Sequence, residues 1–179
     1  VPRLKSTSIS EAATQSSSGP LKGLHLRKQD LRRGIELMFF AYRDFTGEAD
    51  EILSELDLGR AHHRVVYFVG RQPGMSVSDL LSILKITKQS LSRVLSHLIE
   101  TGYVQQTQGA RDKRQRLLSL TKKGVALEAK LTEIQCRRFA AAYSARGGAA
   151  VDGFVKVLSS LLDDEMRTEL QQQYPDHID

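Results

Sequence analysis

Six cationic side chains and a single acid lie within residues 109–124, in the segment GARDKRQRLLSLTKKG. Four of the six cations fall within residues 111–116, and the segment then becomes apolar. A disordered basic tail would not continue into such an apolar run, so we expect the charges to be carried by a folded element. A cluster of this kind can contact a polyanion, most often nucleic acid.

The positive charge of the whole chain is concentrated around this segment. The chain has a net charge of +5, whereas residues 85–124 carry +7 and the remaining residues carry −2. A local basic patch is typical of nucleic-acid binding, although an uneven but merely solvated surface could have the same charge. The pattern therefore favours a nucleic-acid partner without establishing one.

Motifs of enzymes and cofactor sites are missing from the sequence. It contains no nucleophile paired with a base, no glycine-rich phosphate loop, no paired carboxylates and no HExxH pattern. We therefore expect no enzymatic activity, no cofactor and no metal. His62 and His63 are adjacent, and adjacent helical side chains diverge by about 100°. We expect packing or polar roles for these two histidines.

The cellular location is predicted from cysteine content and hydrophobicity. The chain has one cysteine, Cys136, which we expect to be a half-buried thiol, and it has no apolar run of about 18 residues that could span a membrane. No signal-peptide pattern is recognisable. These features predict a cytoplasmic, nucleoid-associated protein without a membrane partner.

Helices are predicted on both sides of the basic region. Residues 1–24 are rich in Ser, Thr and Ala and are expected to be a disordered tail. Apolar periodicity predicts a helix from about His25 to near Gly47, followed by a short helical piece, DEILSEL. Further helices are predicted over 59–71, 122–145 and 149–173, the last with a nearly unbroken apolar stripe.

The middle of the chain predicts a helix, a tight turn, a second helix and a hairpin. QPGMS reads as a turn, after which Ser76 and Thr87 are expected to cap the two helices and Gly102 to end the second. YVQQTQ and RQRLLSL have the length and composition of two hairpin strands. This order is that of a winged helix-turn-helix, in which the second helix enters the major groove of DNA.

The segment DKRQRLLSLTKKG resembles the wing signature of the MarR family of bacterial transcription regulators, with Asp112, Arg114, Leu120, Thr121 and Gly124 at the expected offsets. SVSDLLSILKITKQSLSRVLSHLIETGYV resembles the family's two helices and first wing strand. FFAYRDF and GRAHHRVVYFVGRQPG look most like its PetP-type subgroup. The resemblance covers roughly residues 30–173. It departs from many relatives at Gly59, which opens a helix where they have Thr or Ser.

The resemblance implies a mainly α-helical domain over 25–173. Residues 59–121 would form the DNA-binding lobe with its β-hairpin wing, and the helices of 25–48 and 122–173 would form a homodimer on a palindromic operator. At the wing tip, Arg114 would reach the minor groove, oriented by Asp112; the alternative is a weak surface ion pair between the two.

The expected partners are therefore double-stranded DNA and a second copy of the chain, and the resemblance also allows a small aromatic or phenolic effector. A winged-helix adaptor that binds protein instead of DNA is the alternative. The candidate DNA-binding residues are Lys88, Gln89, Ser90, Ser92, Arg93, Arg111, Asp112, Lys113 and Arg114. The candidate effector-binding residues are Phe39, Tyr42, His63 and Tyr67, although an aromatic stripe of this kind is more often core.

Overall fold

The chain divides into two compact units, residues 1–39 and residues 40–179, and each is described by itself. The computed structural model describes residues 26–109 and 112–173, so the expected tail of residues 1–24 lies outside the described part. Helix α1 (Lys28–Glu55) begins in the first unit and ends in the second. Residues 31–39 are all exposed, and five of them are large and apolar: Leu31, Ile35, Leu37, Met38 and Phe39.

Helix α1 is longer than the sequence predicted. The prediction that it ends near Gly47 is wrong, because the helix continues through DEILSEL as far as Glu55. Ala49 and Leu53 lie on this last part and are fully buried. Burial of such side chains offsets the roughly 1 kcal/mol that a glycine costs inside a helix.

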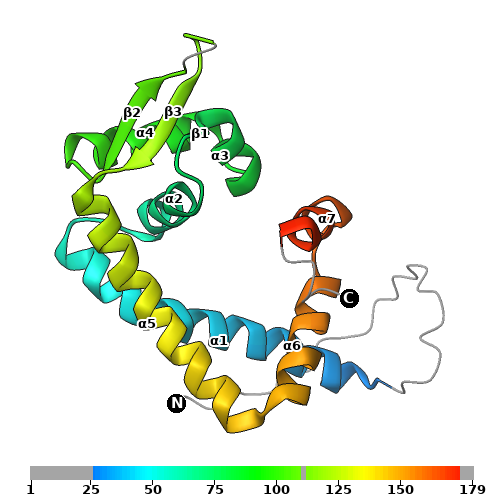
Figure 1. The fold of residues 1–179 in the computed structure, drawn as a ribbon. Coiled ribbons are helices and arrows are strands. Elements are labelled where there is room, and N and C mark those ends of the chain that lie inside the picture. Colours follow the sequence, from blue (N-terminus) through cyan, green and yellow to red (C-terminus); the bar gives the residue numbers. More distant parts are fainter. Residues whose placement is uncertain (1–25, 110–111, 174–179) are drawn as a thin grey trace, which may run out of the picture. The chain divides into compact units, whose positions relative to one another are not determined.

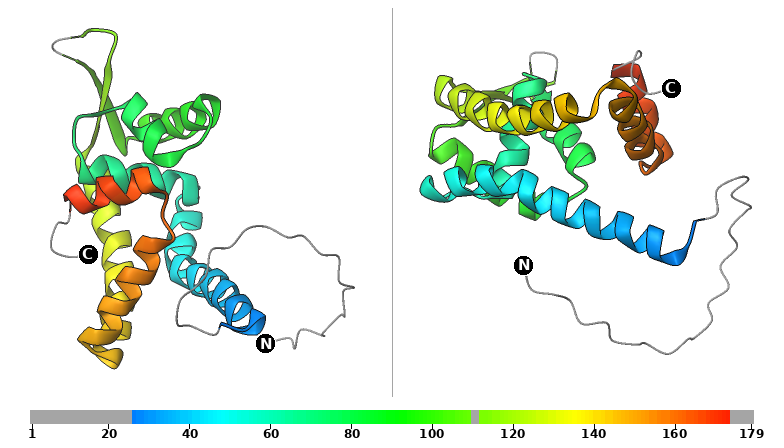
Figure 2. Two further views of the ribbon diagram at one scale, coloured as in Figure 1. Left: turned by 90° about the vertical axis from the view of Figure 1, so that its right-hand side faces the viewer. Right: turned by 90° about the horizontal axis from the view of Figure 1, so that it is seen from below.

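The segment predicted to be the DNA-binding lobe folds into a winged helix. Its elements are α2 (Arg60–Arg71), β1 (Met75–Ser76), α3 (Val77–Leu84), α4 (Lys88–Glu100), β2 (Val104–Gln108) and β3 (Arg116–Leu120) (Figure 1). Three valines of α2 are fully buried at its centre, together with leucines from α3, α4 and β3. The hairpin of β2 and β3 extends beyond the helices of the lobe as a wing (Figure 2).

The sheet has one more strand than expected. Strands β2 and β3 pair antiparallel from Val104 with Leu120 to Gln108 with Arg116, as the hairpin prediction required. The segment QPGMS was predicted to be only a turn, but Met75 pairs with Leu118 and forms the short strand β1 on the other side of β3. Met75 is buried, and its burial explains why the chain extends here.

The caps of the lobe agree with the sequence. Ser76 accepts a hydrogen bond from the amide of Asp79, whose carboxylate accepts one from the Ser76 amide in return, at 3.1 and 2.9 Å. Thr121 accepts from the Gly124 amide at the start of α5 (Lys122–Arg146). Gly102 ends α4 with a φ of 75°, a left-handed conformation that glycine adopts without strain.

The single last helix predicted over 149–173 is wrong. The structure has two helices, α6 (Gly148–Ser160) and α7 (Asp164–Gln173). Arg167 of α7 donates from its guanidinium to the carbonyls of Ser159 and Leu162 near the end of α6. Asp164 and its neighbouring acid occupy the first turn of α7, where negative charge is favoured. None of the helices in the described ranges has the length and apolar character needed to cross a membrane.

Candidate DNA-binding interface

Helix α4 buries one side and exposes the polar side predicted to contact DNA. Leu91, Leu95 and Leu98 are buried in the lobe. The five predicted contact residues of this helix are all exposed: Lys88, Gln89, Ser90, Ser92 and Arg93. Ser90 is partly engaged in capping, because its amide donates to the Thr87 hydroxyl, which in turn donates to the Ser90 hydroxyl at 2.9 Å.

The wing tip is organised by the backbone around Asp112. The amide of Arg114 donates to the Asp112 carboxylate at 2.9 Å, and the amide of Gln115 donates to the Asp112 carbonyl at 3.0 Å. A side-chain acceptor for an amide two residues on is the Asx turn. Asp112 therefore orients the backbone of Arg114. No ion pair between the two side chains is found among the described residues, and Arg111 lies outside them.

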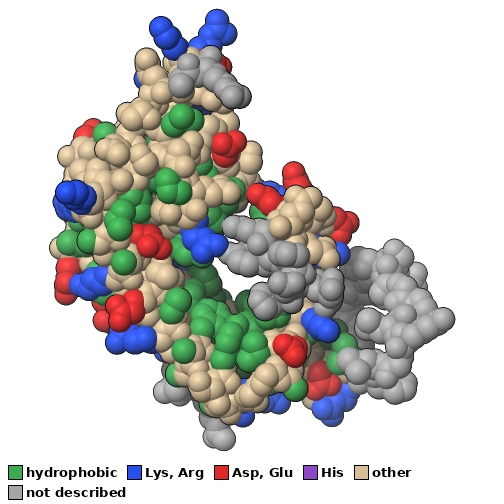
Figure 3. All heavy atoms as spheres, viewed as in Figure 1, with side chains coloured by type: hydrophobic (Ala, Val, Ile, Leu, Met, Phe, Trp, Pro, Cys, Tyr) green, Lys and Arg blue, Asp and Glu red, His purple; other side chains and the backbone are tan. Residues whose placement is uncertain are grey.

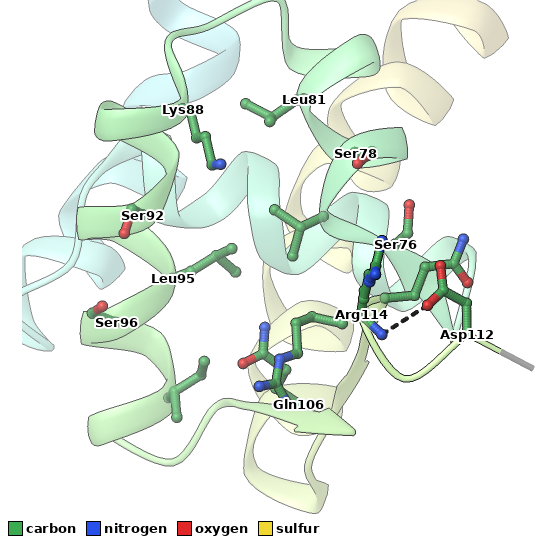
Figure 4. A pocket seen from close by; sticks show the side chains of 14 residues that line it. Ser76, Ser78, Leu81, Lys88, Ser92, Leu95, Ser96, Gln106, Asp112 and Arg114 are labelled. Atoms are coloured by element: carbon green, nitrogen blue, oxygen red, sulfur yellow. Dashed lines mark hydrogen bonds between the residues drawn. The ribbon is translucent and has the colours of Figure 1, made fainter. Parts of the chain in front are cut away.

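A cleft of about 520 Å³ lies between α3, α4 and the wing (Figure 4). Three cations, Lys88, Arg114 and Arg116, line it, and Asp112 is the acid among its lining residues. Four predicted residues line the cleft: Lys88, Ser92, Asp112 and Arg114. Four others are exposed but do not line it: Gln89, Ser90, Arg93 and Lys113.

Several cleft residues were missed by the sequence prediction. They include Ser78, Ser96, Gln106, Gln115 and Arg116. Helical spacing could have found Ser96, which lies one turn after Ser92, and the basic run already contained Arg116. The lysine and arginine side chains at the end of the wing are visible in Figure 3, above the rest of the lobe.

The fold separates Lys123 from the cations of the basic segment 109–124 that line the cleft. The ammonium of Lys123 donates to the Thr101 carbonyl at 2.9 Å and lies 4.1 Å from the centre of the Tyr103 ring. It therefore ties the end of α4 to the start of α5. Lys123 does not line the cleft. The cations that are neighbours in the sequence over residues 109–124 are therefore more numerous than those that line the cleft.

A second cavity, of about 190 Å³, lies between α1, α2 and α5. Three of the four predicted effector residues, Tyr42, His63 and Tyr67, line it, whereas Phe39 does not. The guanidinium of Arg64 donates to the Tyr42 hydroxyl at 3.1 Å. Burial lowers the pKa of His63. The cavity thus combines aromatic walls with cationic side chains.

The remaining sequence predictions concern Cys136 and the two histidines. Cys136 is exposed on α5, so the prediction of a half-buried thiol is wrong; the buried side of this helix is formed by Leu127, Leu131 and Ile134. His62 contacts His97 of α4, at 3.0 Å between Nε2 and Nδ1, while His63 lines the second cavity. Among the described residues there is no group of three potential metal ligands.

Comparison with known proteins identifies the family. The sequence profile of the MarR family matches residues 56–115. The HTH-type transcriptional regulator PetP of Rhodobacter capsulatus is 52% identical over 148 residues, which cover 83% of this chain and 89% of that protein.

Solved structures share the fold. One is FabT of Streptococcus pneumoniae in complex with DNA, with a TM-score of 0.67, 18% identity and coverage of 74% of this chain and 94% of that one. Another is a MarR mutant from E. coli complexed with operator DNA, with a TM-score of 0.60, 20% identity and coverage of 75% and 97%. The chain therefore belongs to the MarR family of winged helix-turn-helix transcriptional regulators.

Proposed function

We propose that this regulator binds a palindromic operator in double-stranded DNA as a homodimer, with α4 in the major groove and the wing against the minor groove. The cleft between α4 and the wing carries the proposal, because Lys88, Arg114 and Arg116 converge there. Cations on two projecting elements suit the phosphates on the two sides of a groove.

The two elements have different tasks in this proposal. Arg93 and Gln89 are exposed on α4, where an arginine can pair with guanine and a glutamine with adenine. Arg114 is exposed on the wing, and a thin basic tip fits the negative potential of a narrow minor groove. Arg111 and Lys113 belong to the same basic tip in the sequence.

The homodimer is supported by apolar surface in each unit. Ile35 and Phe39 in the first unit are 70% and 64% exposed, and Val157 of α6 and Leu161 at its C-terminal end are 63% and 68% exposed. Apolar side chains repeated along a helix favour a protein partner. A second copy is the partner that also supplies the two-fold symmetry of a palindrome.

The second cavity is proposed as the effector site. Tyr42, His63 and Tyr67 supply aromatic walls, and Arg60 and Arg64 lie within the same lining, so a small aromatic acid or phenol suits it. Because α2 belongs to the same lobe as α4, binding of such a compound next to α2 would change the position of α4. Titration with benzoate and phenol, followed by tyrosine fluorescence, tests this part separately from DNA binding.

The proposed role is regulatory and not enzymatic, and it would place the protein in the cytoplasm with the nucleoid. A salt series tests it against the adaptor alternative. A duplex recovered from a random-sequence library should lose affinity steeply as salt rises, with a log–log slope of about −0.9 for each neutralised phosphate. Lys88→Met should reduce the slope by about one unit, and the exposed Lys130→Met on α5 should leave it unchanged. Failure to recover any duplex, or a flat salt response, favours the adaptor.

A further inference from the structure

The side chain of His62 connects the start of α2 to the recognition helix α4. Its Nδ1 accepts a hydrogen bond from the Gly59 amide at 3.0 Å. Its Nε2 lies 3.0 Å from Nδ1 of His97, and both side chains are partly buried. The two rings meet edge to face, with centroids 5.0 Å apart and planes inclined at 79°. One imidazole thus holds two neighbouring elements.

The hydrogen-bond pattern fixes which nitrogen carries each proton. Because Nδ1 of His62 is an acceptor, the proton of the neutral ring must sit on Nε2. Nε2 is then the donor, and Nδ1 of His97 must be the acceptor. The neutral His97 ring therefore carries its own proton on Nε2. Both rings are in the same tautomer, and both Nδ1 atoms accept.

An added proton has no free position in this arrangement. It must occupy Nδ1 of His62, which removes the contact with Gly59 that fixes this ring against His97, or Nδ1 of His97, which removes the contact between the helices. The titratable groups that act on the pKa of His62 are His97 of α4, which lowers it, and Asp57 in the α1–α2 turn, which raises it. Burial is the largest influence and lowers the pKa of His62.

The pair contacts the helix that carries part of the proposed DNA-contacting surface. His97 follows Ser96, which lines the cleft, and is half-buried on the side of α4 that contacts α2. The α4 end is also fixed by Thr101, whose hydroxyl donates to the His97 carbonyl. A change in the contact with α2 is therefore transmitted to the helix that carries Lys88, Ser92 and Arg93.

We propose that His62 and His97 are positioning residues that hold the recognition helix for DNA only while the hydrogen-bonded pair carries no added proton, so that acidification weakens operator binding. The inference rests on the proposed DNA-binding function. The expected direction of the change in DNA affinity is distinctive. Added positive charge alone would strengthen binding to phosphates in acid, whereas release of α4 by the histidine pair would weaken it.

A metal bridge between the two imidazoles is the competing chemistry. Zinc–nitrogen bonds are about 2.0–2.1 Å long, and structural zinc sites have four protein ligands. The described residues provide no third His, Cys, Asp or Glu at this position. The direct hydrogen bond, which needs no further ligand, is the interpretation that the contacts of Gly59 and His97 support.

The experiment measures DNA affinity from about pH 7.5 to about pH 5.5 at constant salt, a range that spans the ordinary titration of histidine. The probe is a labelled duplex recovered by the parent protein from a random-sequence library at the higher pH. The parent should lose about 3- to 10-fold in affinity, the effect of one lost hydrogen bond. His97→Asn should bind like the parent at the higher pH and show a smaller fall, because its amide oxygen accepts from His62 without titrating.

Two further variants make the result specific. His97→Phe keeps a ring but no acceptor, so it should bind weakly at both ends of the pH range. Lys130→Met, the exposed control on α5, leaves both imidazoles in place and should keep the fall in acid. Circular dichroism at each pH confirms that every variant remains folded.

The outcomes separate the inference from the function on which it rests. If no duplex is recovered, the DNA-binding proposal fails and the inference fails with it. If a duplex is recovered but binding is constant or stronger in acid, or His97→Asn falls as much as the parent, only the inference is overturned. Long-range ¹H–¹⁵N spectra give an independent readout: a proton on Nδ1 of neutral His62, or a response of the pair to added Zn²⁺ instead of acid, also overturns it.

Discussion

The backbone amide of Arg114 donates a hydrogen bond to the carboxylate of Asp112 across 2.9 Å. The acid therefore shapes the wing through the main chain, although its negative charge also faces the proposed DNA-binding cleft. These two effects on DNA binding have opposite signs. They can be separated by substitutions that remove the charge with or without the acceptor oxygen.

Asp112→Asn should bind DNA at least as tightly as the parent, because the amide oxygen keeps the turn while the negative charge is lost. Asp112→Ala should bind more weakly, since the turn loses a contact of about 1 kcal/mol and the position of Arg114 is no longer fixed. Both affinities are measured on the same duplex at the same salt concentration. Equal behaviour of the two variants would show that the turn does not matter for binding.

Arg93 and Arg114 should affect sequence preference differently. Arg93→Ala should relax selectivity at one base position in each half-site, by roughly 1–3 kcal/mol if its contact is bidentate. Arg114→Ala should weaken binding to many sequences alike, with some loss of preference for narrow A·T-rich flanks. The measurement is a panel of single-base operator variants. If Arg114→Ala binds every duplex as tightly as the parent, the wing does not touch DNA.

Val157→Asp should abolish the dimer without unfolding the chain. Val157 is 63% exposed on α6, so the substitution costs little in the single chain but places a charge on the proposed interface. Sedimentation at micromolar concentration should give about twice 20.0 kDa for the parent and about 20.0 kDa for the variant. Lys156→Ala, an exposed neighbour, is the control and should remain dimeric.

Gly124→Ala should destabilise the junction between the wing and α5. A Cβ atom at this position would lie 2.1 Å from the Tyr103 carbonyl oxygen, so the backbone has to shift. We expect a loss of about 1–3 kcal/mol in the free energy of unfolding, measured with urea. Gly47→Ala in α1 is the matched control, because nothing lies within 4 Å of its Cβ and alanine favours a helix.

The free energy of unfolding should fall as the solution is acidified below about pH 6.5, the ordinary pKa of histidine. Burial lowers the pKa of both His62 and His63 in the folded protein. The unfolded chain therefore binds protons first, and stability is lost from the unfolded pKa down through the folded ones. Replacing both histidines with glutamine should shrink this loss, measured by urea unfolding at a series of pH values. An unchanged loss would assign it to other groups.

The fold was predictable from the sequence where local chemistry decides it. The caps at Ser76, Thr87 and Thr121 and the stop at Gly102 are set by residues within a turn of the helix end. The errors in helix and strand boundaries arose where contacts between residues far apart in the sequence decide the local structure. The burial of Leu53 extends α1 past Gly47, and pairing of Met75 with Leu118 makes a strand from a predicted turn.

The candidate site was predictable in its residue types but not in its grouping. The basic run in the sequence pointed to Arg114 as a DNA-contacting residue. The sequence could not show that the Asp112 carboxylate would accept from the Arg114 amide, or that Lys123 would lie over the Tyr103 ring. The contact of His62 with His97 joins residues 35 positions apart on two helices, and no spacing rule brings them together. Such relationships come from the crossing of α2 and α4.

The absence of a linker between the wing and α5 has a mechanical consequence. Strand β3 ends at Leu120, and α5 begins at Lys122 and runs to Arg146. A helix of 25 residues is about 37 Å long, so a tilt of about 5° at one end displaces the other by about 3 Å. A Cβ atom at Gly124 would collide with the Tyr103 carbonyl, so the first turn of α5 lies close against the residue that precedes β2. A small rotation at that turn therefore corresponds to an ångström-scale displacement at Arg146.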